Sequence, residues 1–318
     1  MTKISFVIPC YRSEKTIEKV VDEINDSVKK MEGYNHEIIL VNDCSPDNTI
    51  EVLKKLSEKF DFVTTIDFAR NFGQHSALMA GLRESKGDIV VCLDDDGQTP
   101  PDECYKLIDA LEDGADAVYA RYAHKKHSLF RNFGSYVNEE MARFMLEKPK
   151  ELYISSYFAV KRFVVNDMIR YENSYPYVIG LVLRSTKSIV NVDINHRARE
   201  VGESGYSFKK LLGLWLNGFT SFSIKPLRVA TIVGAFCSFA GIIYGIIIII
   251  QHFVLPNRQL GFASLESSIL FMGGAILIML GLIGEYVGRI YISMNASPQY
   301  VIKRIYRKDD KPGEDDKN

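Results

Sequence analysis

The sequence lacks the glycine motifs with which most nucleotide-binding proteins hold phosphates. No G-x-G-x-x-G pattern follows the first strand-like segment, and G-x-x-x-x-G-K-[ST] occurs nowhere in the 318 residues. Both motifs cradle phosphate groups on backbone N–H groups, so their absence argues against a dinucleotide-dependent dehydrogenase and against a P-loop NTPase.

Paired cysteines and an excess of one charge are also missing. None of the five cysteines forms a C-x-x-C pair, which disfavours a zinc site and favours reduced thiols in a cytosolic compartment. The formal net charge is −1, so the overall charge gives no reason to expect nucleic acid as a partner. Residues 1–3 lead straight into an apolar segment, and no secretory signal is expected there.

Apolar strand-like segments alternate with helical periodicity through the first 120 residues. Strands are predicted at 3–9, 36–41, 62–67, 88–93 and 115–120, and helices at about 13–31, 50–59, 74–85 and 101–111. Further strands are expected at 155–160 and 189–196, with a helix starting at Arg162. This alternation predicts an α/β fold, a parallel sheet with helices on both faces.

Polar clusters follow the first four strands. The fourth strand ends in Asp94-Asp95-Asp96-Gly97-Gln98, and the second ends in Asn42-Asp43. Ligands of open α/β sheets bind beyond the carboxyl ends of the strands, so Asp94 and Asp96 are placed to hold a divalent cation on a diphosphate. Asp43 could bind a base or ribose. Alternatively, the segment after it is simply a capped turn that starts the next helix.

A basic stretch precedes the membrane-like part of the chain. Arginines alone are usually solvated, but Arg121, Arg131, Arg197 and Arg199 together would suit an anionic lipid headgroup. Residues 204–226 follow, where aromatic and leucine side chains alternate with lysines. We expect this amphipathic segment to lie in the plane of the headgroups, with packing against the catalytic domain as the alternative.

Two long apolar runs mark the C-terminal part. Residues 229–250 carry no charge over 22 positions, and a second run covers 267–284 and continues to about 292. Either run can cross a hydrocarbon core about 30 Å thick, and the short link between them predicts a transmembrane hairpin of about 229–251 and 267–290. Basic residues flank its outer ends, while Arg258 alone lies in the link, so both termini are expected in the cytoplasm.

The predicted organisation therefore has four parts. They are a cytoplasmic catalytic domain at 1–203, the amphipathic segment at 204–226, the membrane hairpin at 227–292 and a charged cytoplasmic tail at 293–318. Small residues at Gly281, Gly284 and Gly288 offer a face through which the hairpin could form a homo-oligomer.

Six motifs, none of them specific alone, are spread over nearly the whole chain. They are Ile8-Pro9-Cys10-Tyr11, Asn42 to Asp47, Arg70 to Gln74 with Ala80-Gly81-Leu82, Asp94 to Pro101, Arg199 to Ser204 and Gly284 to Arg289. Jointly they resemble glycosyltransferase family 2, in the group that charges polyisoprenyl phosphates. That group includes dolichyl-phosphate mannose synthases and undecaprenyl-phosphate glucosyl- and 4-deoxy-4-formamido-L-arabinose transferases.

The resemblance implies a GT-A domain, a Rossmann-like nucleotide-sugar-binding fold, with a nucleotide sugar (UDP-linked in bacterial members) as donor and undecaprenyl phosphate as acceptor in the cell membrane. It implies Mg²⁺ or Mn²⁺ held by Asp94, Asp96 and Gln98. Catalysis is assigned to Asp94, Asp96, Arg121 and Arg199, and the lipid phosphate to Arg121, Arg131, Arg197, Arg199 and Ser204. The donor site comprises Pro9, Tyr11, Glu14, Asp43, Asp67, Arg70, Asn71, Gln74 and Asp95.

One departure from the family pattern bears on the mechanism. Many relatives carry an acidic residue where this chain has Ser155 and Ser156. A phosphate acceptor needs no general base, because its second pKa is about 6 and it is largely dianionic at neutral pH. We therefore expect inverting transfer of one sugar by a single displacement. Two alternatives stay open, a non-catalytic nucleotide-sugar-binding scaffold and, with less support, a processive polysaccharide synthase.

Overall fold

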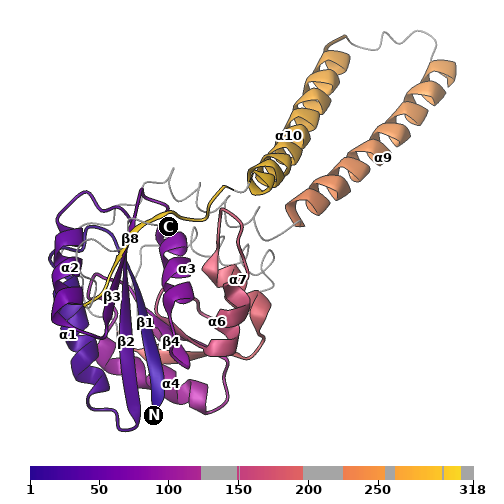
Figure 1. The fold of residues 1–318 in the computed structure, drawn as a ribbon. Helices are drawn as coiled ribbons and strands as arrows, with labels where there is room; N and C mark the ends of the chain where they lie inside the picture. Colours follow the sequence, from indigo (N-terminus) through magenta and orange to yellow (C-terminus); the bar gives the residue numbers. More distant parts are fainter. Residues whose placement is uncertain (123–148, 150, 196–224, 255–261, 296, 309–318) are drawn as a thin grey trace.

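Eight strands form one mixed sheet in the computed structural model, which describes residues 1–122, 149, 151–195, 225–254, 262–295 and 297–308 (Figure 1). In chain order they are β1 (Thr2–Cys10), β2 (Tyr34–Asn42), β3 (Val63–Phe68), β4 (Ile89–Cys92), β5 (Ala117–Tyr122), β6 (Phe158–Lys161), β7 (Ile189–Ile194) and β8 (Ile302–Tyr306). Their spatial order is β7-β5-β6-β4-β1-β2-β3-β8.

Helices cover both faces of the sheet. One face carries α1 (Ile17–Val28), α2 (Thr49–Lys59) and α4 (Cys104–Glu112), which follows the short helix η1 (Pro101–Glu103). The other face carries α3 (Gln74–Glu84), α6 (Arg162–Met168) and α7 (Val178–Ser185). The period-two alternation of a strand divides the core: Ile4, Phe6 and Ile8 of β1 face the first layer, whereas Val7 faces the second.

Helix α3 packs unusually close to the sheet. A Cβ atom added at Gly81 would lie 2.3 Å from Cγ1 of Val7 on β1 and 3.4 Å from Cγ2 of Val41 on β2. Any side chain at this position would collide with the central strands. The glycine therefore sets the distance between α3 and the sheet, and with it the position of the loop that leads into α3.

The predicted parallel sheet is confirmed for its centre and wrong for two strands. β4, β1, β2 and β3 run parallel in adjacent positions, and β7 is parallel to β5. β6 runs antiparallel to β4 and β5, and β8 runs antiparallel to β3. Apolar periodicity identifies a strand but carries no information on its direction. β6 and β8 each begin at the edge of the sheet where the parallel strands end. An antiparallel strand can start at that edge, so the chain needs no helix to cross back to the other edge first.

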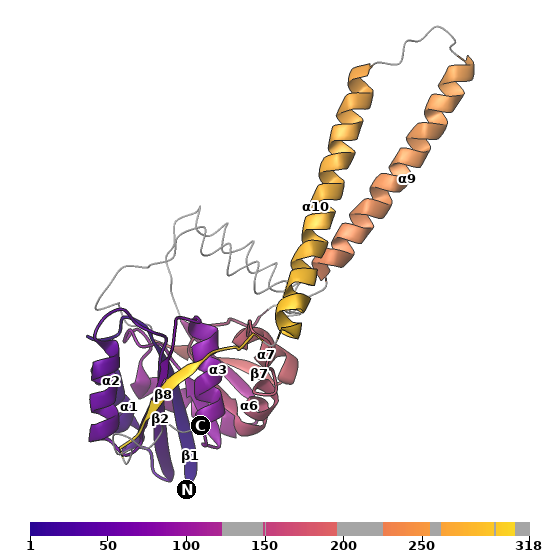
Figure 2. The same ribbon diagram turned by 45° about the horizontal axis from the view of Figure 1, so that its top comes forward.

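Two long helices, α9 (Lys225–Val254) and α10 (Phe262–Met294), project together from one end of the catalytic domain (Figures 1 and 2). Within the described residues, one helical segment, Phe271–Ile292, is long and apolar enough to span a membrane by length and composition. The predicted apolar runs are thus helical. The amphipathic segment 204–226 lies outside the described residues except for its last two positions, which begin α9.

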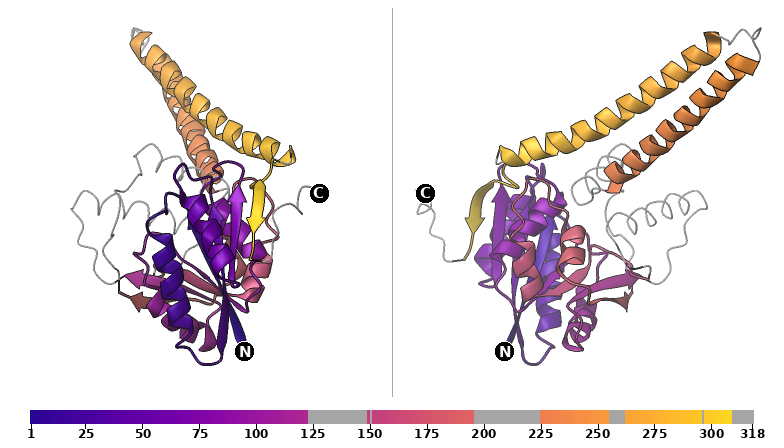
Figure 3. Two further views of the ribbon diagram at one scale, coloured as in Figure 1. Left: turned by 60° about the vertical axis from the view of Figure 1, so that its left-hand side comes forward. Right: turned by 90° about the vertical axis from the view of Figure 1, so that its right-hand side faces the viewer.

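The chain returns to the sheet after α10. The predicted charged tail contains β8, which lies along β3 at the edge of the sheet (Figure 3). The hairpin therefore begins and ends at the same domain. The carboxyl ends of β1 to β4 face the end of the domain from which the hairpin projects (Figures 1 and 2).

Candidate active site

Neighbouring strands bring four predicted clusters to one edge of the sheet. Because β4, β1, β2 and β3 are adjacent and parallel, the residues that follow them meet beyond their carboxyl ends. This confirms the expected convergence of the segments that begin at Asp94, Tyr11, Asp43 and Phe68.

Asp94 lies at the centre of this edge. Its carboxylate accepts a hydrogen bond from Nε2 of Gln74 at 3.1 Å and another from Oγ of Ser156. Burial, assisted by the neighbouring charges of Asp96 and Asp95, raises the pKa of Asp94 to about 6. With Asp95 and Asp96 beside it, Asp94 belongs to a run of three carboxylates that is short of positive charge.

Asp95 serves a different purpose from its neighbours. Its carboxylate accepts the backbone N–H of Tyr11 at 3.1 Å and the hydroxyl of Ser13, and so ties the β4 motif to the turn after β1. Burial raises the pKa of this carboxyl as well. Asp95 therefore shapes the rim of the site through the backbone of Tyr11, whose ring is 46% exposed.

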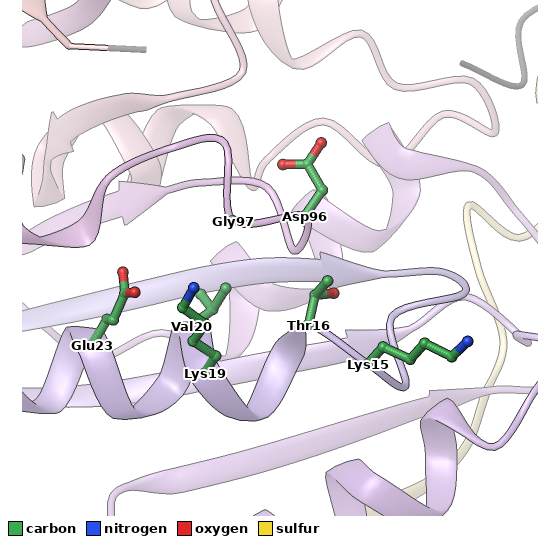
Figure 4. Close-up of a pocket in the computed structure, with 7 residues that line it drawn as sticks. All are labelled: Lys15, Thr16, Lys19, Val20, Glu23, Asp96 and Gly97. Atoms are coloured by element: carbon green, nitrogen blue, oxygen red, sulfur yellow. The ribbon is translucent and has the colours of Figure 1, made fainter. Parts of the chain in front are cut away.

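Asp96 opens the turn that follows β4. Its Oδ1 accepts the backbone N–H of Gln98 at 3.1 Å. A hollow between this turn and α1 is lined by Lys15, Thr16, Lys19, Val20, Glu23, Asp96 and Gly97. Figure 4 shows the carboxylate of Asp96 directed away from the α1 side chains of this hollow. The oxygen atoms of Asp96 are thus presented above the turn and not toward α1.

Asp43 holds the loop between β3 and α3. Its two carboxylate oxygens accept the backbone N–H groups of Phe72 at 2.6 Å and Gly73 at 2.8 Å, and Nδ2 of Asn71 donates to its carbonyl oxygen at 3.0 Å. Gly73 has φ = 90°, a conformation that favours glycine. We call residues 69–73 the donor loop. The predicted contact between Asp43 and a nucleotide remains a prediction, and its carboxylate is already engaged here.

The other predicted donor-site residues lie at or beyond the carboxyl ends of β1 and β3. Asp67 accepts Nδ2 of Asn42 at 2.7 Å, while Oε2 of Glu14 accepts the backbone N–H of Asn48 at 3.1 Å. The guanidinium of Arg70 lies 4.6 Å from the ring centroid of Phe72. Pro9 pairs in register with Val41 near the end of β1.

The turns after β1 and β2 share a backbone feature. Arg12 (φ 61°) and Cys44 (φ 51°) are the non-glycine residues with positive φ in the described part of the chain. Such conformations are uncommon for residues with a side chain and are enriched at functional sites. Both lie directly beyond the strands whose ends form the site.

The basic residues assigned to phosphates are only partly described. Arg121, at the end of β5, forms two hydrogen bonds with Asp193 of β7, at 2.6 and 3.0 Å, and this ion pair raises the pKa of the guanidinium. β6 separates β5 from β4 in the sheet. Arg131, Arg197, Arg199 and Ser204 lie outside the described residues.

The donor atoms near Asp94 fit a hard divalent cation. No group of three or more His, Cys, Asp or Glu side chains in the described ranges is arranged as a complete metal site. Asp94, Asp96 and Gln98 supply carboxylate and amide oxygens, and a cation would offset the burial and the neighbouring charges that together raise the pKa of Asp94. Mg²⁺ usually takes one or two carboxylates and completes its shell with phosphate oxygens and water.

Ser13 and Ser156 take part in this site although no sequence motif singled them out for contacts with the aspartates. Each hydroxyl donates to an aspartate of the β4 motif from another segment, 82 residues away for Ser13 and 62 for Ser156. Ser156 stood out in the sequence only as a departure from the family pattern. A serine has no local signal that indicates a partner so far along the chain.

The mixed α/β sheet, with its carboxylates at the carboxyl edge, has a GT-A-like fold. The chain belongs to glycosyl transferase family 2, whose model matches residues 5–169, and it is a glycosyltransferase. A second model, the GtrB C-terminal hairpin, matches residues 225–290. The predicted family and fold are therefore confirmed, and the enzyme prediction is upheld over the scaffold alternative.

Curated relatives match the chain along nearly its whole length. The undecaprenyl-phosphate 4-deoxy-4-formamido-L-arabinose transferase of Proteus mirabilis (strain HI4320) is 31% identical over 312 residues, covering 96% of this chain and 94% of the relative. The protein of the same name from Photorhabdus laumondii is 30% identical over 306 residues, with 95% and 94% covered.

Solved structures of more distant proteins share the fold. Glucosyl-3-phosphoglycerate synthase of Mycobacterium tuberculosis with Mn²⁺, UDP-glucose and phosphoglyceric acid aligns with a TM-score of 0.52 at 18% identity, over 70% of this chain and 78% of that one. The same synthase with Mg²⁺ and UDP gives a TM-score of 0.51 at 19% identity, over 69% and 77%. At these identities the likeness concerns the fold alone.

Proposed function

We propose that this glycosyltransferase transfers one sugar from a UDP-linked donor to undecaprenyl phosphate. The observation that carries the proposal is the position of the Asp94–Asp96 motif, at the sheet edge that faces the end from which the hairpin projects. A lipid phosphate held in a bilayer would approach from that side. The names of the relatives, which match over more than nine-tenths of the chain, support this acceptor and a pentose derivative among the candidate sugars.

The proposed reaction is a single displacement with inversion. An oxygen of the lipid phosphate forms a bond to the anomeric carbon of the sugar as the bond from that carbon to the nucleoside diphosphate breaks. Since the acceptor is already anionic, no proton has to be removed and no general base is required. The hydroxyl of Ser156, which donates to Asp94, is consistent with such a mechanism because it adds no negative charge beside the motif.

Asp94, Asp96 and Gln98 would hold Mg²⁺ or Mn²⁺, which when bound neutralises charge on the departing diphosphate. Asp43, Asn71 and Gln74 would line the donor side, and the predicted arginines would offset the repulsion between the two anionic substrates. Asp95 would keep Tyr11 at the rim through its hydrogen bond to the backbone.

We place the protein in the cytoplasmic membrane, with two spans and with both termini on the cytoplasmic side. β8 pairs with β3 after α10, so the two ends of the hairpin return to one domain, as an even number of crossings requires. The excess of basic residues at the outer ends of the hairpin agrees with this orientation.

The test is incubation of purified membranes with labelled UDP-sugars and undecaprenyl phosphate, with donors screened in parallel. The expected product is a lipid-linked sugar that mild acid releases and that contains one sugar per lipid. A polymer would instead indicate a processive synthase. Donor binding without any product, across the donor panel, would contradict the proposed activity.

A further inference from the structure

The segment that leaves the membrane hairpin contacts the donor loop directly. Residues 297–306, which we call the C-terminal strap, follow α10 and include β8. The backbone N–H of Ala69, the first residue of the donor loop, donates to the carbonyl oxygen of Val301 at 2.9 Å. The β3–β8 register is irregular between Asp67 and Phe68, where the donor loop begins.

Two successive aromatic contacts connect the strap to the donor loop. The ring of Tyr300 stacks on the buried ring of Phe68 with centroids 5.2 Å apart and planes 8° apart. Phe68 in turn meets Phe72 edge to face at 5.7 Å. The backbone N–H of Phe72 is one of the two donors to the carboxylate of Asp43. Two ring contacts therefore connect Tyr300 to Phe72, whose backbone N–H binds the carboxylate of Asp43.

Further contacts anchor the strap to α3 and to the segment after α6. Nη1 of Arg83 donates to the hydroxyl of Tyr300 at 2.9 Å, and the guanidinium carbon lies 5.4 Å from the centroid of the same ring. Gln299 is 5% exposed, and its Nε2 donates to the carbonyl oxygens of Tyr171 at 3.3 Å and Asn173 at 3.0 Å. These contacts place Tyr300 against α3 and the segment after α6.

We propose that Tyr300 is a positioning residue for the donor nucleotide: through Phe68 and Phe72 the C-terminal strap keeps the donor loop in the conformation that Asp43 binds. This inference rests on the proposed function in two respects: the donor is a nucleotide sugar, and the donor loop lies beside it. The proposed role links the membrane hairpin to donor binding, because Tyr300 lies only six positions after Met294, the last residue of α10. Without the ring of Tyr300, Phe68 loses its stacking partner, and the donor loop samples other conformations.

The test compares Tyr300→Ala with Tyr300→Phe in the full-length protein. Tyr300→Phe keeps the stack on Phe68 and loses only the hydrogen bond from Arg83. An aromatic pair contributes about 0.5–1.5 kcal/mol, so Tyr300→Ala should raise the donor KM, and the Kd for UDP measured calorimetrically, roughly two- to tenfold. The KM for the lipid and kcat should not change, and Tyr300→Phe should match the wild type.

A double variant tests whether the effect of Tyr300 on UDP binding passes through Phe72. If Tyr300 acts through Phe72, then Tyr300→Ala combined with Phe72→Ala should weaken UDP binding no more than Phe72→Ala alone. Arg307→Ala serves as a matched control, because it removes an ion pair with Glu84 just beyond the strap. This control should leave the Kd for UDP unchanged. If Tyr300→Ala does not fold, Tyr300→Leu replaces it in every comparison.

Three outcomes would overturn the inference: an unchanged Kd for UDP in Tyr300→Ala, an effect of equal size in Tyr300→Phe, or independent effects in the double variant. UDP binding is measured without any acceptor. A wild type that binds UDP but makes no lipid product therefore contradicts the proposed function, while the binding comparison still decides the role of Tyr300.

Discussion

The hydroxyl of Ser156 donates a hydrogen bond to the carboxylate of Asp94, across 62 residues of sequence. This contact joins the segment before β6 to the motif after β4. The family resemblance leads us to expect an acidic residue in the segment of Ser155 and Ser156, and an acid there would add a fourth negative charge near Asp94, Asp95 and Asp96. The serine instead stabilises the ionised form of Asp94, whose pKa burial raises to about 6.

Ser156→Ala tests whether this residue acts in proton transfer. Loss of the hydrogen bond should lower kcat/KM by less than about tenfold, whereas loss of a general base would cost about 10²–10⁴-fold. Initial rates of lipid-linked product formation at saturating metal are the measurement. A loss of activity as large as that of an Asp94 variant would mean that the hydroxyl takes part in the chemistry.

Asp94→Asn and Asp96→Asn should each lower transfer by at least about a hundredfold, because a carboxylate ligand of the proposed metal is removed. Their thermal unfolding midpoints should stay close to that of the wild type. Mn²⁺ affinity, measured by electron paramagnetic resonance of the free ion, should fall in parallel. Asp113→Asn, an exposed position after α4, is the matched control. Activity near the wild-type level in both variants would refute the metal assignment.

Asp43→Asn should weaken donor binding. An amide group can accept at only one of the two positions where Asp43 now accepts the N–H groups of Phe72 and Gly73, so one partly buried N–H loses its partner. The cost of about 1–3 kcal/mol corresponds to roughly a fivefold or larger increase in donor KM. Asp61→Asn, on an exposed turn before β3, controls for the charge change. A larger effect on lipid KM than on donor KM would contradict this role.

His75 should make the stability depend on pH. It lies half-buried in α3 beside Tyr177, its buried Nδ1 has no hydrogen-bond partner among the described residues, and loss of solvation lowers its pKa to about 4. The unfolded chain binds a proton near pH 6.5 and the folded chain does not, so this contribution to stability is lost as the pH falls.

The loss from this group between pH 7 and pH 5 should be roughly 2 kcal/mol. His75→Phe keeps an aromatic ring beside Tyr177 and removes the titrating group, so its unfolding free energy should fall less over the same interval. Urea unfolding at the two pH values provides the comparison. Equal slopes for the wild type and His75→Phe would show that His75 is not buried in its neutral form.

Gly81→Ala should destabilise the domain. The new methyl group would lie 2.3 Å from Cγ1 of Val7, and overpacking of this kind costs about 1–3 kcal/mol. Val7→Ala removes the colliding atom, so the double variant should be less destabilised than the sum of the single variants. Thermal unfolding followed by circular dichroism measures all four proteins. Strict additivity would mean that α3 moves away from the sheet instead.

The sequence predicted which segments meet at the carboxyl edge of the sheet. Asp43, Asp94 and the segment around Asn71 were predicted together because parallel strands that alternate with helices end at one edge. The sequence could not predict that Asp43 binds the backbone of Phe72 and Gly73, since this depends on the φ of Gly73 and on the approach of two loops. The pairing of Arg121 with Asp193 likewise depends on the adjacency of β5 and β7.

The sequence by itself determined the strands β1 to β7, the apolar hairpin and the position of the carboxylates along the chain, because periodicity, hydropathy and local motifs are properties of short segments. Tertiary structure alone decided the directions of β6 and β8 and the contact of Ser156 with Asp94. It also decided the return of the C-terminal strap to β3, where Tyr300 meets Phe68. These features join residues far apart in the chain, and they form only when the sheet edge and the end of α10 bring those residues within contact distance.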